Sequence, residues 1–256
     1  MWLKQNKWKI IIPIVIAAIL VIAFFSGRAP SEDDISDTMA SALVSTPVIE
    51  NYAEASPTPD AVTGATENAG SEEYSEANGM ELDEETGKDK YETAPVPEGK
   101  PVPVEPEDVE IGDEEYTCTL SISCATILNN KELCDPDKWE LVPEDGWILM
   151  PVELTFYEGE SVFHVLRRSC KQLGIHMEFS NTPVYNSAYI EGIGNLYEFD
   201  VGELSGWKYK VNDWFPNYGC SRYQLADGDV ICWVYTCDLG FDVGGGYSSV
   251  NGGKAG

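Results

Sequence analysis

Acidic residues are concentrated in one part of this 256-residue chain, and that concentration limits where a folded core can form. Residues 31–115 carry 25 acidic and three basic side chains, a net charge of −22 out of −28 for the whole chain. This stretch has few large apolar side chains, so it buries too little apolar surface to offset the entropy lost on ordering. We therefore expect residues 28–115 to be a disordered acidic and proline-rich linker, and residues 116–240 to be the globular domain.

The negative charge also argues against nucleic acid as a partner. Binding to DNA or RNA needs clustered Lys and Arg side chains, because much of the affinity comes from released counterions. The basic cluster of this chain, Lys4, Lys7 and Lys9, lies within residues 1–9, directly before an apolar run. Its position fits a membrane orientation signal.

The apolar run, residues 10–27, predicts a transmembrane signal-anchor. Its sixteen apolar residues from Ile10 to Phe25 span about 24 Å as a helix, close to a hydrocarbon core of about 30 Å. The preceding lysines place residues 1–9 in the cytoplasm and the remainder outside. A cleaved signal peptide shares these features and stays an alternative. We expect a single-pass cell membrane protein with an extracellular C-terminal domain, or a secreted protein if the leader is cleaved.

Periodicity predicts two strands and a helix at the start of the globular domain. Polar and apolar residues alternate in residues 116–128 and 147–157, which is typical of half-buried strands. Residues 162–173 repeat apolar side chains at helical spacing, between an N-cap at Ser161 and a stop at Gly174. We expect the strands to be antiparallel and the helix to cover their inner face.

The remaining strands complete the expected fold. Residues 207–212 alternate, and residues 230–237 are apolar on both faces, which is typical of a central strand. This order of elements predicts an α+β fold, a β-grasp-like mixed sheet with one packed helix. The chain ends in a glycine-rich tail, residues 241–256, of which residues 244–256 are expected to fray.

Several short motifs follow one another through the globular part in a defined order. They are Gly159-Glu160-Ser161-Val162-Phe163, Val165-Leu166, Ile190-Glu191-Gly192, the segment from Gly206 to Asn212, Pro216, Gly219, Tyr223, Leu225, Asp227-Gly228-Asp229, Ile231, Trp233 and Tyr235. In order and spacing, residues 117–240 resemble the transcobalamin-like C-terminal domain family, which has bacterial cell-surface members. Asp213 departs from the family, which usually has glycine there to make a tight turn.

The resemblance implies a β-rich domain with one helix. In the transporters for cobalamin, the related domain closes over the vitamin against a helical barrel. Residues 31–115 cannot form such a barrel, so half of that binding site is missing. Binding of cobalamin or another small molecule by an accessory protein is kept as an alternative, and no other cofactor is expected.

Seven cysteines lie in the globular part, and an extracellular location permits disulfides. The expected direction of the helix brings Cys170 toward Cys124 at the end of the first strand, so we expect a Cys124–Cys170 bridge. Cys220 with Cys237 is a second candidate pair. The alternative is that these residues are buried thiols. No Cys-x-x-Cys motif occurs, so no metal site is predicted.

Aromatic residues cluster between residues 185 and 223, among asparagines and glycines. Loop aromatics of this kind make adaptable binding surfaces. The alternative is ordinary packing of these loops onto the sheet. The candidate binding residues are Tyr185, Tyr189, Trp214, Phe215 and Tyr218.

The sequence offers no arrangement that predicts catalysis. His164 faces away from the apolar stripe of the helix, and Cys170 lies on that stripe, so a pairing of Cys170 with His176 as nucleophile and base is disfavoured. We therefore expect no enzyme activity. The prediction is a membrane-anchored extracellular module that binds a protein, a glycan or a small ligand, with a structural or adhesive surface module as the alternative.

Overall fold

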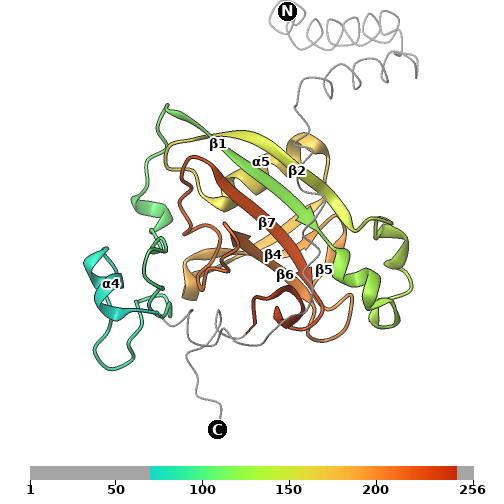
Figure 1. Ribbon diagram of the computed structural model, residues 1–256, viewed down its shortest axis with the longest axis horizontal. Helices are drawn as coiled ribbons and strands as arrows, with labels where there is room; N and C mark the ends of the chain where they lie inside the picture. The colour runs from blue at the N-terminus through green and yellow to red at the C-terminus, as the bar shows by residue number, and fades with distance from the viewer. Residues whose placement is uncertain (1–69, 247–256) are drawn as a thin grey trace, which may run out of the picture. The chain divides into compact units, whose positions relative to one another are not determined.

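The computed structural model describes residues 70–246, which form an α+β domain with two β-sheets and one long helix (Figure 1). The predicted transmembrane segment, residues 10–27, lies outside the described residues, as does the tail from residue 247. No helix within residues 70–246 combines the length and the apolar character that crossing a membrane requires. The α+β class is confirmed, although the single sheet that the sequence predicted is divided into two.

Four strands form the principal sheet, in the order β2-β1-β7-β6. They are β1 (Glu115–Ser123), β2 (Trp147–Tyr157), β6 (Gly206–Val211) and β7 (Asp229–Thr236). Strand β1 is antiparallel to β2, with Leu120 opposite Val152, and parallel to β7, with Leu120 opposite Ile231. Strand β6 pairs with β7 in antiparallel fashion. Strand β7 is thus central, as its two apolar faces predicted.

The second sheet is a small meander of β3 (Met177–Thr182), β4 (Ser187–Ile193) and β5 (Leu196–Tyr197), in that order. Gly194 and Asn195 connect β4 to β5 and both have φ of 63°. Positive φ at both loop residues is what a two-residue hairpin turn requires. This local pairing explains why residues 177–197 form a sheet of their own and do not extend the principal sheet.

Helix α5 (Val162–Leu173) packs on the inner face of the principal sheet, as expected. Its N-terminus is closed by a reciprocal cap, because Ser161 Oγ accepts a hydrogen bond from His164 N and His164 Nδ1 accepts one from Ser161 N. Gly174 ends the helix with φ of 68°. The buried face includes Leu166, which lies in the same core as Leu120 and Ile231.

The segment preceding β1 departs most from the sequence prediction. Residues 70–109, here called the strap, are ordered against the domain and begin with α4 (Glu72–Ala77). Two widely spaced apolar side chains of the strap, Met80 and Val96, lie in the core at 6% and 0% exposure. The prediction of a disordered linker over residues 28–115 is therefore wrong for residues 70–115. A few buried side chains are enough to order this segment, because the surface of the domain on which it packs is already folded.

The cysteines also differ from the prediction, since all seven are free thiols. Cys170, on the buried face of α5, and Cys220 lie in the principal core. Cys124 and Cys237 lie in a second apolar cluster, around Tyr235. The predicted Cys124–Cys170 and Cys220–Cys237 bridges are wrong, because each pair is divided between the two clusters. The alternative of buried thiols is the one that the structure shows.

Burial should make most of these thiols unreactive. It raises the pKa of the thiols from 9.0 to about 11 or about 12 at Cys118, Cys124, Cys170, Cys220 and Cys237. In the folded protein we expect half-buried Cys232 to react first with a thiol reagent, and the buried thiols to react only on unfolding. Fast labelling of Cys118 or Cys220 near neutral pH would contradict this.

The same shifts predict how stability depends on pH. Between pH about 9 and about 12 the unfolded chain loses thiol protons that the folded chain keeps. The free energy of unfolding should therefore fall across this window. Urea unfolding at a series of alkaline pH values measures the fall, and replacing Cys220 by Ser should reduce its slope.

Candidate ligand-binding cavity

A cavity of about 540 Å³ lies between β4, β6 and the strap. Strand β4 contributes residues 187–190 to its wall, β6 contributes residues 206–209, and the strap contributes residues 91–93. Its volume falls within the range of about 300–1,000 Å³ that is typical of small-molecule sites. The cavity is thus large enough for a small organic ligand.

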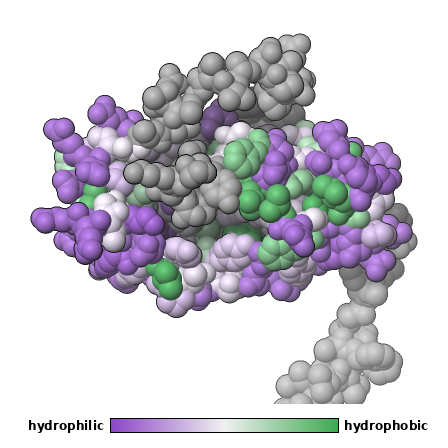
Figure 2. Space-filling view, turned by 90° about the horizontal axis from the view of Figure 1, so that it is seen from below, coloured by the Kyte–Doolittle hydropathy of each residue, from purple (hydrophilic) through white to green (hydrophobic). Residues whose placement is uncertain are grey.

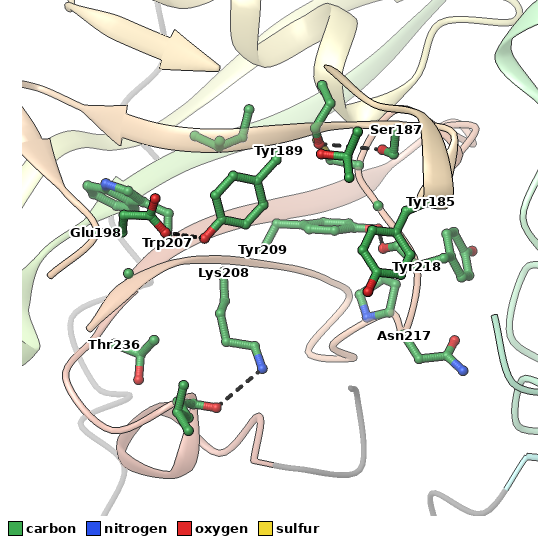
Figure 3. A pocket seen from close by; sticks show the side chains of 18 of the residues that line it. Tyr185, Ser187, Tyr189, Glu198, Trp207, Lys208, Tyr209, Asn217, Tyr218 and Thr236 are labelled. Atoms are coloured by element: carbon green, nitrogen blue, oxygen red, sulfur yellow. Dashed lines mark hydrogen bonds between the residues drawn. The ribbon is translucent and has the colours of Figure 1, made fainter. Parts of the chain in front are cut away.

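Aromatic rings make up much of the wall, as Figure 3 shows for several of them. Three of the candidate binding residues, Tyr185, Tyr189 and Tyr218, line the cavity although about thirty positions separate the first from the last. Tyr185 and Tyr189 are 54% and 47% exposed, so their rings are accessible from solvent. The other aromatic lining residues are Tyr91, Phe199, Trp207, Tyr209 and Trp233.

Part of the cavity wall is apolar and exposed to solvent. Phe199, Leu204 and Leu239 line the cavity and are among the exposed large hydrophobic residues of the domain. Figure 2 shows several hydrophobic side chains right of the centre of one face, with hydrophilic ones around them. Exposed apolar side chains that gather at a hollow are a common mark of a binding site.

Trp214 and Phe215 do not line the cavity. Asn212 and Asp213 adopt φ of 50° and 60°, so the tight turn forms even though Asp213 replaces the glycine of the resembling family. After this turn Trp214 points into the core, at 8% exposure, with its ring 6.0 Å from that of Tyr218. The structure thus gives Trp214 a packing role, while Phe215 is half-buried with Lys208 above its ring.

The charged residues of the cavity were missed by the sequence analysis. Glu198 lies beside Tyr189 and Trp207 (Figure 3), and the Tyr189 hydroxyl donates a hydrogen bond to its Oε2 atom. Burial and this carboxylate both raise the pKa of Tyr189, so the phenol stays protonated. Lys208 Nζ lies 2.7 Å from the carbonyl oxygen of Gly245, and burial lowers its pKa. Nothing in the spacing of these residues indicated that the fold brings them together.

Arg222 fastens the strap to the cavity wall. Its side chain is 1% exposed, and its Nη2 atom lies 2.6 Å from Asp89 Oδ2 and 2.7 Å from Glu105 Oε1. Its Nη1 atom donates a hydrogen bond of 2.6 Å to Thr93 Oγ1. The guanidinium also lies over the ring of Tyr91, 5.0 Å from its centroid. One buried cation thus holds several strap residues, two of which line the cavity.

Unsatisfied polar atoms are concentrated in the same wall. Among residues 70–246, the buried side-chain nitrogen and oxygen atoms without a hydrogen-bond partner are Asn217 Oδ1, Arg222 Nε and Trp233 Nε1. All three residues line the cavity. Leaving such a group unpaired costs about 1–3 kcal/mol, so native proteins contain few of them. Because these atoms have almost no accessible surface, they belong to the packing behind the wall and are not groups that the cavity presents to a ligand.

The described residues contain no group of three or more His, Cys, Asp or Glu side chains that could hold a metal ion. His164 caps α5, and His176 Nε2 lies 3.4 Å from Glu178 Oε1 near the surface. Neither histidine lines the cavity. The lining combines aromatic and aliphatic side chains with carboxylate, amide, hydroxyl, thiol, ammonium and guanidinium groups.

Residues 159–236 match the model of a family described as a domain of unknown function (DUF4430). None of the curated proteins compared with the chain matches it. One similar solved structure is haptocorrin in complex with Cbi, at 12% identity and a TM-score of 0.36, with coverage of 49% of this chain and 26% of haptocorrin. Another, from Ruminococcus gnavus ATCC 29149, is described provisionally as a metal binding protein, at 11% identity and a TM-score of 0.29, with coverage of 47% and 96%.

The matched part of this chain thus corresponds to about a quarter of the length of haptocorrin.

Proposed function

We propose that residues 70–246 form a binding module that takes a small organic ligand in this cavity. The observation that carries the proposal is a cavity of about 540 Å³ whose wall combines aromatic rings with a few polar side chains, among them Glu198 and Asn217. Ligand sites typically combine a largely apolar and aromatic lining with a few polar groups that orient the ligand. A ligand with a planar or apolar body and some polar substituents suits this lining.

We propose that the module binds its ligand without converting it. The thiol that lines the cavity belongs to Cys220, and burial raises its pKa to about 12. A thiol of that pKa is protonated at neutral pH and is a poor nucleophile. No histidine lines the cavity to serve as a base beside it. These features support binding over chemical conversion of the ligand.

We further propose that the module acts outside the cell, anchored by residues 10–27 or secreted after their cleavage. The lysines before the apolar run support this orientation. Added protease should remove a C-terminal tag from intact cells. A tag that is protected until the cells are lysed would contradict the extracellular location.

Replacing Tyr185 or Tyr189 by Ala should weaken ligand binding about tenfold, because an aromatic contact contributes about 0.5–1.5 kcal/mol beyond its burial. Both side chains are about half exposed, so the fold should be retained. Binding can be measured by an NMR screen of small aromatic, glycan and corrinoid compounds against the full chain, followed by titration of each compound that binds.

Tyr157→Ala is the matched control, because Tyr157 is 39% exposed on β2 and does not line the cavity. Equal losses of affinity in all three variants would contradict a site at the cavity. A pull-down that captures a glycan or protein without any effect of Tyr185 or Tyr189 would instead favour an adhesive surface.

A further inference from the structure

Negative charge is in excess around the cavity. Glu198 and Glu203 line it, and neither forms an ion pair with any residue in 70–246. The guanidinium of Arg222 is outnumbered by two carboxylates, those of Asp89 and Glu105. The wall near the strap therefore adds no net positive charge.

The other charged residues of the cavity wall do not cancel this excess of negative charge. Glu92 pairs with Lys88 at 3.3 Å. Lys208 lies close enough to Asp242 for that carboxylate to raise its pKa against the effect of burial. The amino group of Lys208 also bonds to the carbonyl oxygen of Gly245. With the chain as a whole at −28, the cavity favours a cation over an anion.

Glu198 has one carboxylate oxygen that no described residue hydrogen-bonds. Its Oε2 atom accepts the hydrogen bond from Tyr189, whereas its Oε1 atom accepts none from residues 70–246. The indole of Trp207 is fixed by a hydrogen bond of 2.8 Å from its Nε1 atom to the carbonyl oxygen of Leu196. Figure 3 shows Glu198, Tyr189 and Trp207 together on one side of the cavity, with Asn217 on the other.

Aromatic rings beside a carboxylate form a favourable site for a positive charge. The face of an aromatic ring attracts a cation, and Trp and Tyr are the strongest such rings. Partial exclusion of water strengthens the attraction between the cation and the carboxylate. Trp207 and Glu198 are both half-buried, so the site is partly dry but can be reached from the cavity.

We infer that the ligand carries an ammonium-type positive charge, which binds at the Glu198 carboxylate beside the rings of Tyr189 and Trp207. The apolar body of the ligand then lies along Tyr209 and Tyr218. This inference rests on the proposed binding function and specifies the class of ligand, an organic cation with an apolar or aromatic body.

The test compares three probes with one body and different charges: phenylpropylamine, phenylpropanol and phenylpropanoate. They are titrated into the full chain, labelled with fluorotryptophan and held in nanodiscs of uncharged lipid, with empty nanodiscs as the blank. Fluorine NMR follows the Trp207 signal, assigned from a Trp207→Phe variant. We expect the amine to bind about tenfold more tightly than the alcohol, and the carboxylate to bind most weakly.

Glu198→Gln keeps the shape of the side chain and its ability to accept a hydrogen bond from Tyr189. In this variant the preference for the amine over the alcohol should disappear, while the affinity for the alcohol stays within about twofold. Glu140→Gln removes the same charge from an exposed residue outside the cavity wall and should leave the preference intact. The preference should also shrink as salt is added.

Each outcome decides between the two proposals. If the alcohol binds as tightly as the amine, or if Glu140→Gln removes the preference as fully as Glu198→Gln, the cationic ligand is wrong but the binding cavity stands. If the carboxylate binds best, the site prefers an anion and the inference of a cationic ligand is wrong. If none of the probes and none of the compounds in the earlier screen moves the Trp207 signal, the binding function itself is overturned.

Discussion

Replacing Arg222 by Met is expected to lower the free energy of unfolding by about 3–5 kcal/mol, because it leaves buried carboxylates without a counter-charge. The side chains of Asp89 and Glu105 are 8% and 18% exposed, and both lie within 2.7 Å of the guanidinium. Methionine replaces the aliphatic part of the side chain but supplies neither the charge nor the hydrogen bonds of the guanidinium. Urea unfolding of the full chain measures the loss.

The matched control is Lys88→Met, which breaks the pair between Lys88 and Glu92 at 29% and 56% side-chain exposure. Exposed pairs of this kind contribute at most about 1 kcal/mol. A loss at Arg222 no larger than that at Lys88 would show that the strap is not held by the buried pairs. Neutralising the carboxylates as well, with Asp89→Asn and Glu105→Gln, should recover part of the stability lost in Arg222→Met.

The position of Arg222 connects stability to the proposed site. It lies in the loop of residues 217–222, which also hydrogen-bonds to the strap through Asn217 and Tyr218. Because the strap supplies residues 91–93 to the cavity wall, its release would open one side of the cavity. Hydrogen exchange in Arg222→Met should therefore increase first in residues 70–105, and ligand affinity should fall with it.

Local patterns were sufficient to predict most of the regular structure. The alternation of apolar residues located β1, β2 and β6, and the two apolar faces of β7 placed it at the centre of the sheet. The cap at Ser161 and the glycine at Gly174 marked both ends of α5. These predictions succeed because each depends on residues that are neighbours in the sequence.

The strap could not be predicted because its stabilising contacts are remote in sequence. Arg222 is 133 positions from Asp89 and 117 from Glu105. By composition the strap resembles a disordered linker, since its anchors are a few residues in an acidic segment. Composition describes the average of a segment, whereas order here depends on where single side chains meet a folded surface.

The candidate site was predicted in part for the same reason. The aromatic cluster among glycines and asparagines predicted five binding residues, of which Tyr185, Tyr189 and Tyr218 line the cavity, whereas Trp214 and Phe215 do not. The turn at residues 212–213 directs Trp214 into the core. No sequence pattern indicated Glu198 as a site residue, because it is one of many acidic residues in the chain. Only the fold shows that it lies beside Tyr189. Whether these residues bind a ligand stays a prediction.

Helix α5 packs in the core and hydrogen-bonds to the segment that carries Arg222, and Leu166→Ala should show how much this packing stabilises the domain. Leu166 is fully buried at 0% exposure, and removal of such a side chain typically costs about 2–5 kcal/mol. Leu173→Ala, in the last turn of the same helix at 53% exposure, should cost less than about 1 kcal/mol. Thermal or urea unfolding of the two variants gives the comparison, and equal losses would contradict the packing of α5 on the sheet.

The loss at Leu166 should extend to ligand binding. At the N-terminus of α5, Val162 N donates a hydrogen bond of 3.1 Å to the carbonyl oxygen of Tyr223, and Phe163 N donates one of 3.2 Å to that of Cys220. The loop that holds Arg222 is therefore fixed by the helix on one side and by the strap on the other. Loosening α5 should weaken ligand binding even though Leu166 does not line the cavity, whereas Leu173→Ala should leave affinity unchanged.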